Sequence, residues 1–377
     1  MITAHSTAAK IIRSTTFLKS TVRRHGAVLA LAILVGLIYG STHFFIPREL
    51  AKTGGDYRPL TFASHADASV YGIRANAVYQ GQWLTGDISI QEQSGNPATL
   101  PLLNPLLMGG LGRILGSLDR AFILSDFIFP PLIFIALYFL AFELTRARTL
   151  ALFFATFFIF IPKAILTIPP ITLPLLQTFL QHILPDTSDI LYFIRFEYPK
   201  ITFLFSVPAL YGLLRAIRRD QNEPRNTTLA DPLRGSKMNI AKVNIRGERW
   251  STWLAGICFG LMFYTYLHDW VYFFIAISLI GAILALSGKY KVCVRLASIA
   301  GIGFVISAPY WYNFFLLRQL PQYQDIAARI GLEMSRSLRW TSVEKSYFRI
   351  AALIAAMLYI VPKRERVPLF YLSGLLL

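Results

Sequence analysis

Long apolar stretches alternate along this chain with short connections rich in lysine and arginine. Eight stretches come close to the roughly 20 residues that a helix needs to cross a bilayer, and another opens at residue 367. The eight cover residues 27–46, 121–142, 149–168, 200–217, 251–267, 270–287, 296–317 and 347–361. With 55% of 377 residues hydrophobic, a soluble fold could not bury this surface. We therefore expect an all-α, polytopic membrane bundle of about nine spans.

The basic residues predict which ends of the spans face the cytoplasm. Cytoplasmic loops of membrane proteins carry an excess of lysine and arginine, and a cytoplasmic N-terminus puts every basic connection of this chain on that side. The predicted inner connections are 143–148, 218–250, 288–295 and 363–366. The predicted external segments are 47–120, 169–199, a tight turn at 267–270, and 318–346. We therefore expect a multi-pass protein of the cytoplasmic (plasma) membrane.

The formal net charge of +17 reflects this topology and does not indicate a nucleic-acid site. Nearly all of the excess lies in the predicted inner segments, where basic residues face anionic lipid. The expected partners are therefore the lipid bilayer and a membrane-borne substrate, with no nucleic acid.

Two polar regions divide the chain into parts. Residues 1–26 form a basic, cytoplasmic N-terminus before an uncleaved first span. Residues 218–250 are polar, basic and rich in turn formers, so we expect a linker between two sets of spans, 27–217 and 251–377. The apolar run that opens at residue 367 is too short to cross before Leu377, so we expect the protein to continue beyond it.

Two segments of the first external loop, 68–84 and 101–118, are predicted to be helices that lie along the membrane surface. On the first, one face carries Val70, Ile73, Ala77, Gly81 and Leu84. On the second, the apolar face carries Leu103, Leu106, Leu107, Gly110, Leu111, Ile114, Leu115 and Leu118, and the opposite face Asn104, Gly109, Gly112, Arg113 and Gly116. If 101–118 crossed the membrane instead, every later basic loop would face outward. We expect these helices to form, with 169–199, the roof of a cavity open to lipid.

Acidic residues at the predicted external face are the candidate site residues, because polar groups at the edge of a bilayer are costly unless they serve structure or function. Asp67 opens the first surface helix. It is a candidate for chemistry, but Ser64-x-x-Asp67 also fits a capping box, in which Asp67 only accepts a backbone N–H.

A second candidate lies in the next external loop, where Asp186 and Asp189 are followed by Arg195. Two carboxylates can hold a divalent metal ion, and an arginine can bind a phosphate through two hydrogen bonds. The alternative is that Asp186 and Ser188 cap a short helix while Arg195 and Lys200 extend to the interface.

Two further features are candidates near the external ends of spans. His268 and Asp269 could bind a substrate or relay a proton, although His268-Asp269-Trp270 also fits a polar turn with Trp270 in the aromatic belt. Asp126 and Lys163 could pair across the bundle, either as a site or as a structural bridge.

The order of these features resembles the C-type (GT-C) membrane glycosyltransferases, a family that includes aminoarabinose, mannosyl and oligosaccharyl transferases. The resemblance covers roughly residues 27–320. It rests on a first span, a long external loop with an acidic residue before an amphipathic helix (67–83), a second surface helix (LPLLNPLLMGGLGRIL) and then a dense run of spans.

The resemblance implies hexosyl or pentosyl transfer from a polyprenyl-phosphate donor to an acceptor at the external face. It gives Asp67 the role of general base or acceptor-positioning residue, Asp186 and Asp189 a role in binding a metal or the acceptor, and Arg195 the donor phosphate. The sequence departs from many members in two respects: Asp67 stands alone where they have a paired acidic motif, and these 377 residues do not include the family's usual final spans or a C-terminal external domain.

Other classes of membrane protein share part of this pattern. A transporter or flippase of a lipid-linked or small polar substrate would also surround polar groups with many spans, but such proteins tend to show paired internal repeats, and this sequence has none. A non-catalytic scaffold with the first loop as docking surface is a further alternative. So is a polymerase or ligase of lipid-linked glycans.

Overall fold

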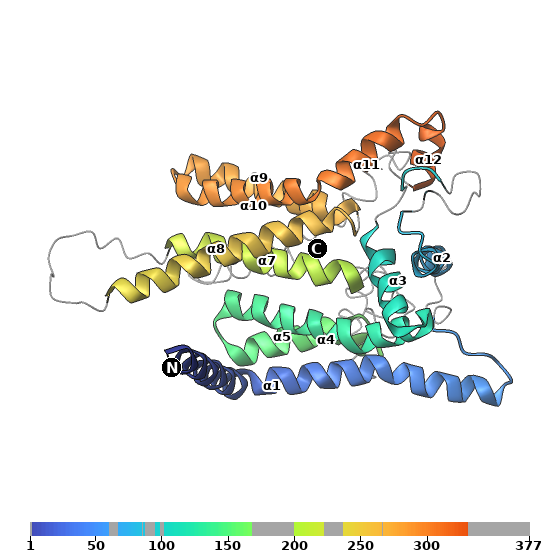
Figure 1. Ribbon diagram of the computed structural model, residues 1–377, viewed down its shortest axis with the longest axis horizontal. Coiled ribbons are helices and arrows are strands. Elements are labelled where there is room, and N and C mark those ends of the chain that lie inside the picture. The colour runs from blue at the N-terminus through green and yellow to red at the C-terminus, as the bar shows by residue number, and fades with distance from the viewer. Residues whose placement is uncertain are drawn as a thin grey trace.

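The computed structural model describes residues 2–59, 67–84, 86, 95–98, 102–167, 200–221, 237–265 and 267–330, and every regular element within these ranges is an α-helix. The long helices run side by side (Figure 1). They are α1 (Ile2–Lys52, kinked at His25), α4 (Leu118–Thr145), α5 (Arg148–Thr167), α7 (Lys200–Gln221), α8 (Lys237–Met262), α9 (Leu267–Leu286) and α10 (Tyr290–Ile306). The shorter helices are α2 (Asp67–Tyr79), α3 (Leu103–Leu115), α11 (Ala308–Arg318) and α12 (Tyr323–Ile330).

Among the described residues, four helical segments are long and apolar enough to cross a bilayer. They are His25–Lys52, Leu118–Thr145, Lys200–Arg218 and Asp269–Leu286. Helices α10 and α11, bent by 54° at the break between them, make a fifth if they form one span, and α5 and α8 contribute shorter apolar stretches. The predicted all-helical bundle with membrane-capable helices is confirmed. The total of nine spans stays a prediction, since the last two lie outside the described residues.

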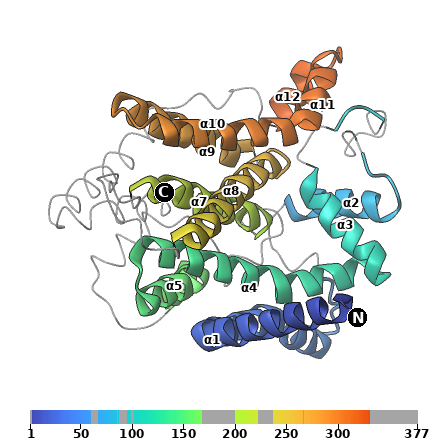
Figure 2. The same ribbon diagram turned by 60° about the vertical axis from the view of Figure 1, so that its left-hand side comes forward.

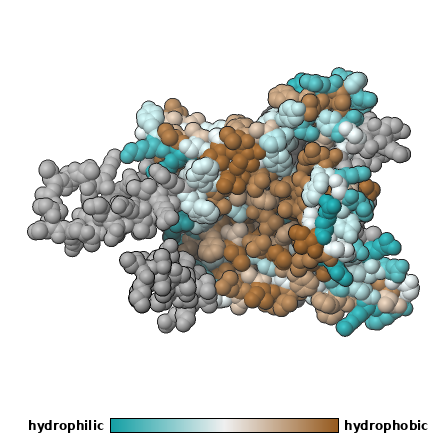
Figure 3. Space-filling view, in the orientation of Figure 1, coloured by the Kyte–Doolittle hydropathy of each residue, from teal (hydrophilic) through white to brown (hydrophobic). Residues whose placement is uncertain are grey.

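The outer surface of the long helices is apolar along its middle and polar toward both ends (Figure 3). Large apolar side chains of these helices are exposed, such as Phe45, Leu132, Phe153 and Ile283. A soluble monomer rarely exposes a continuous apolar patch of more than a few hundred Å². Contact with lipid accounts for this surface.

Small residues bring the long helices close together. A Cβ placed on Gly36 of α1 would come within 2.6 Å of the Phe127 carbonyl oxygen on α4, and one on Gly212 of α7 within 2.7 Å of the Ser251 carbonyl oxygen on α8. Helices in a bilayer associate through such close packing, because lipid offers no hydrophobic drive between them. Helix α7 contributes buried side chains to two apolar cores, one shared with α1, α4 and α5 and the other with α8, α9 and α10.

Helices α2 and α3 lie across one end of the long helices (Figures 1 and 2). Each has 13 residues, which at 1.5 Å per residue is too short to cross a bilayer. Helix α3 ends where Gly116 adopts φ +69°, and Ser117 then caps α4 by accepting the Arg120 N–H. This placement agrees with the two predicted surface helices. Their external side stays a prediction.

Helices α2 and α3 contact the rest of the protein through faces that differ from their predicted apolar faces. On α3, Asn104, Gly109 and Gly112 are buried while Ile114 is exposed, so the small and polar face points into the protein. On α2, Ala75 and Val78 are buried and meet Gly109. Ile73 of the predicted stripe on α2 is exposed, and the stripe was predicted to extend too far, because the helix ends before Gly81, whose φ is +105°.

The basic turns gather at one end of the bundle. The α4–α5 turn with Arg146 and the α9–α10 turn with Lys289 both lie at the end opposite to α2 and α3 (Figure 1). We expect that end to be cytoplasmic. A single cysteine at Thr99 should therefore react with an impermeant maleimide from the outside, and one at Thr228 only from the inside, after Cys258 and Cys293 are replaced by alanine. Labelling of both positions from the same side contradicts the topology.

Candidate functional site

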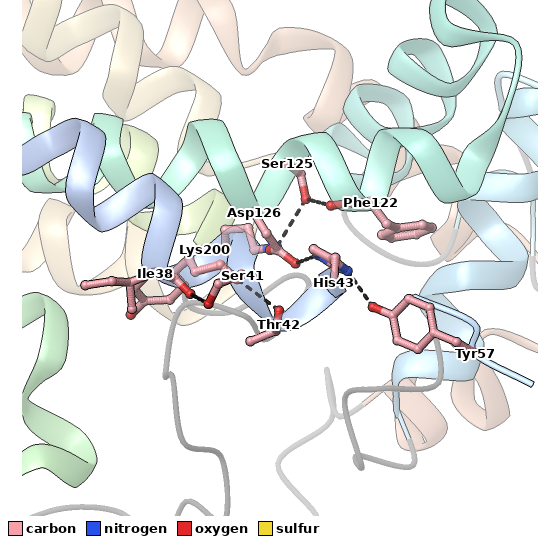
Figure 4. A network of polar contacts seen from close by, with 10 residues as sticks. Ile38, Ser41, Thr42, His43, Tyr57, Phe122, Ser125, Asp126 and Lys200 are labelled. Atoms are coloured by element: carbon pink, nitrogen blue, oxygen red, sulfur yellow. Dashed lines mark hydrogen bonds and ion pairs between the residues drawn. The ribbon is translucent and has the colours of Figure 1, made fainter. Parts of the chain in front are cut away.

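Four polar side chains from three helices and one loop meet near the end of the bundle that carries α2 and α3 (Figures 1 and 4). They are His43 of α1, Asp126 of α4, Lys200 of α7 and Tyr57, which follows α1, and we call them the charged cluster. The side chains of His43, Asp126 and Lys200 are only 4%, 7% and 2% exposed. Ionisable residues inside a membrane bundle are costly, so such a cluster is a candidate site by default.

The sequence of α1 explains how His43 reaches this position. Val28, Ala32, Val35 and Tyr39 are buried and follow each other at intervals of three or four residues, which places them on one helix face. His43 continues that row by one more turn. Gly36 and Gly40 on the same side let α1 approach Phe127 of α4 closely. The imidazole is thereby held against Asp126, the residue before Phe127.

Both oxygens of the Asp126 carboxylate are occupied. His43 Nε2 lies 2.9 Å from Oδ2, and the Lys200 ammonium donates to Oδ1. The ammonium also donates to Ser125 Oγ at 3.2 Å, and the Ser125 hydroxyl donates to the Phe122 carbonyl oxygen at 2.7 Å. A carboxylate only accepts hydrogen bonds, so His43 Nε2 must carry the proton.

Tyr57 completes the cluster from the loop after α1. Its hydroxyl is hydrogen-bonded to His43 Nδ1. Burial raises the pKa of Tyr57 to about 12, and the negative charges of Asp126 and Asp119 act in the same direction. The phenol therefore keeps its proton at neutral pH and can donate it to Nδ1 of a neutral imidazole. In that state Asp126 and Lys200 balance each other's charge.

The cluster is a continuous chain of hydrogen bonds from the first loop into the bundle. Because the Lys200 cation is already bound to Asp126, it is not available to hold a phosphate. The chain instead fixes the loop residue Tyr57, ten positions before Asp67, to α1, α4 and α7. Its geometry suits positioning of the first loop, and the row of exchangeable protons suits proton relay.

The charged cluster bears on two of the sequence predictions. Asp126 is paired, with Lys200 and His43; its predicted pairing with Lys163 stays a prediction, because the Lys163 side chain lies outside the described residues. Lys200 does not extend to the interface and is buried. The reason is spatial: the first residue of α7 lies opposite Asp126, and the sequence does not specify which helices are neighbours.

The other predicted site residues are only partly described. Asp67 is the first residue of α2 and His268 lies in the first turn of α9, but both side chains lie outside the described residues. So do Asp186, Asp189 and Arg195, within 168–199. Asp269 is described, and its carboxyl interacts with the Thr202 hydroxyl of α7. Among the described residues, no group of three or more His, Cys, Asp or Glu could hold a metal ion.

The sequence prediction missed His43 and Tyr57. For His43 there was a signal, since it continues the row of buried positions on α1. Tyr57 lies in a polar loop, and no periodicity marks it. No family model, curated protein or solved structure matches this chain.

Proposed function

We propose that this protein is a membrane glycosyltransferase that moves a sugar from a polyprenyl-phosphate donor to an acceptor at the external face. The observation that carries the proposal is the position of Asp67. It is the first residue of a short helix that lies, with α3, across one end of a bundle of membrane-capable helices. A polyprenyl-phosphate sugar keeps its tail in the bilayer and its sugar at the interface, so this end of the bundle is where a carboxylate would meet it.

The proposed reaction is a nucleophilic substitution at the anomeric carbon of the donor sugar. Asp67 takes the proton from the acceptor hydroxyl or amine as its heteroatom attacks the anomeric carbon of the donor sugar. The bond between that carbon and the phosphate oxygen breaks, and the polyprenyl phosphate leaves with the electron pair. Arg195 stabilises the negative charge that grows on the phosphate. Asp186 and Asp189 bind the acceptor, directly or through a divalent metal ion.

The charged cluster supports this reaction by holding the first loop. Tyr57 is anchored through His43 to Asp126, and the chain runs from Tyr57 directly to Asp67. A catalytic group must be held within a fraction of an ångström of its productive position, and a misplacement of 1 Å can cost on the order of 100-fold in rate. An anchor close to Asp67 in the sequence limits its freedom.

The test is transfer of labelled sugar in proteoliposomes that contain the full chain. Polyprenyl-phosphate-linked hexoses and pentoses are supplied as donors, with a membrane extract of the native host as acceptor source. We expect release of free polyprenyl phosphate and label in a new product with at least one donor. If a folded protein turns over none of them but moves the lipid-linked sugar between leaflets, the flippase alternative holds.

A further inference from the structure

A second group of polar side chains is buried where three helices begin. Asn104 is the second residue of α3, Thr202 the third of α7, and Asp269 and Trp270 lie in the first turn of α9. The unpaired atoms are both polar atoms of the Asn104 amide, Thr202 Oγ1, Asp269 Oδ2 and Trp270 Nε1. All are buried and make no hydrogen bond within the described part of the chain. Asn104 and Thr202 are each 1% exposed. We call these four residues the unpaired cluster.

Contacts among the helix ends place the cluster in one region. The Leu103 N–H donates to the Tyr264 carbonyl oxygen at 2.9 Å, which holds the start of α3 against the residues that follow α8. The Trp270 ring stacks on Phe263 with centroids 4.3 Å apart. The Thr202 hydroxyl lies close enough to the Asp269 carboxyl to act on its charge, although no hydrogen bond of good geometry joins the two. The first turns of α3 and α9 thus both contact residues 263–264, and the first turn of α7 contacts that of α9.

This arrangement is unusual because proteins rarely leave buried polar groups unsatisfied. An unpaired buried donor or acceptor has lost its hydrogen bonds to water, and no hydrogen bond within the protein replaces them. In the same structure the members of the charged cluster do have partners, since His43 and Lys200 are both bonded to Asp126. The unpaired atoms therefore indicate partners that the described residues do not supply.

The chemistry of the atoms specifies the ligand. Asn104 offers both an amide donor and a carbonyl acceptor, Thr202 can do both, Trp270 only donates, and an ionised Asp269 only accepts. A phosphate does not fit, because the Asp269 carboxylate would repel it and the Lys200 cation is bound to Asp126. Hydroxyl groups, which donate and accept at once, match this mixture. The aromatic rings of Phe263, Trp270 and Trp311 add the apolar surface that the carbon skeleton of a sugar needs.

We infer that Asn104, Thr202, Asp269 and Trp270 form a binding site for the hydroxyl groups of a sugar. The identification of this sugar as the donor or the acceptor of a transfer reaction rests on the proposed function. Binding itself does not, because it follows from the unpaired atoms alone.

The test uses Asn104→Leu, which keeps the size of the side chain and removes its polar atoms. Because the Asn104 amide has no hydrogen-bond partner among the described residues, the variant should have a melting temperature equal to or above that of the wild type. It should also bind sugar at least tenfold more weakly. Binding is measured in nanodiscs by saturable quenching of tryptophan fluorescence with methyl glycosides of hexoses and pentoses. Trp270 itself reports on the site.

Tyr39→Phe is the matched control. The Tyr39 hydroxyl is equally buried but donates to the Ile159 carbonyl oxygen at 2.7 Å. Its removal should lower the melting temperature and leave the dissociation constant for the glycosides unchanged. The two variants therefore shift stability and binding in opposite ways.

Three results overturn the inference: a lower melting temperature for Asn104→Leu, wild-type affinity in that variant, or no saturable response of the wild type to any of the glycosides. The last result is also expected if water alone fills the site. If the wild type binds glycosides as expected but transfers no sugar, the proposed function fails and the binding site stands. If transfer occurs with an unchanged KM in Asn104→Leu, the binding site fails and the proposed function stands.

Discussion

Asp67→Asn should give a folded, normally expressed protein that has lost sugar transfer by a factor on the order of 10²–10⁴. Asparagine has nearly the size of aspartate and is an equally good residue at a helix N-terminus, but it cannot accept the proton of the acceptor. The variant therefore separates the two roles that a carboxylate at the start of α2 can have. The measurement is the rate of release of polyprenyl phosphate from the labelled donor in proteoliposomes.

The capping role predicts a different outcome for the same variant. An asparagine cap retains most of the stability of the helix, and even a lost cap costs only about 1 kcal/mol, so activity would stay close to that of the wild type. Asp325→Asn is the control, since Asp325 is also an acidic residue in the first turn of a short helix, α12, and has no role in the proposed reaction. Full turnover by Asp67→Asn would exclude Asp67 as the general base.

The sequence predicted the helices well because the length and polarity of a stretch decide whether it suits a bilayer. Residues 121–142 lie within α4, 270–287 exceed α9 by one residue, and the crosswise helices α2 and α3 begin within two residues of their predicted starts. The ends were less certain. Both crosswise helices stop early, because Gly81 and Gly116 have positive φ, and glycine adopts such values without cost.

The orientation of α3 could not be predicted by the rule that holds for soluble helices. In water an apolar face turns toward protein, but at a membrane the same face can turn toward lipid. Small residues such as Gly109 then meet the neighbouring helix, where a Cβ would lie 2.5 Å from the Ala75 carbonyl oxygen. Asn104 lies on this small and polar face and is buried for that reason.

The site residues were the hardest part to predict, because a polar group has a role only through its neighbours in space. Asp126 was predicted to be paired because it is a carboxylate within a span, and it is paired. Its partner could not be chosen from the sequence, since α4 packs against α1, α5 and α7 at once. Lys163 of α5 and Lys200 of α7 were equally plausible on charge alone.

The Asp126–Lys200 pair should be far more important for stability when one partner is removed than when both are replaced. Asp126→Leu leaves the Lys200 ammonium buried without a counter-charge, and such a change typically costs about 3–5 kcal/mol. In Asp126→Leu with Lys200→Met, two apolar side chains take the place of the pair, which is often neutral. We expect the double variant to recover most of the loss, except for the His43 hydrogen bond, about 1 kcal/mol. The measurement is the free energy of unfolding of each variant in mixed micelles.

An exposed ion pair provides the control for this cycle. Lys52 donates to Glu49 at 2.7 Å, but both side chains are about two-thirds exposed, so Glu49→Gln should change stability by no more than the ~0–1 kcal/mol typical of surface pairs. If Asp126→Leu were as mild as Glu49→Gln, the buried pair would not hold α4 to α7. If the double variant were as unstable as the single one, specific packing around the charges would matter more than their balance. If the double variant recovered its stability but had lost sugar transfer, the pair would instead have its role in positioning the first loop. In that variant stability is restored, but His43 and Tyr57 have lost their anchor on Asp126.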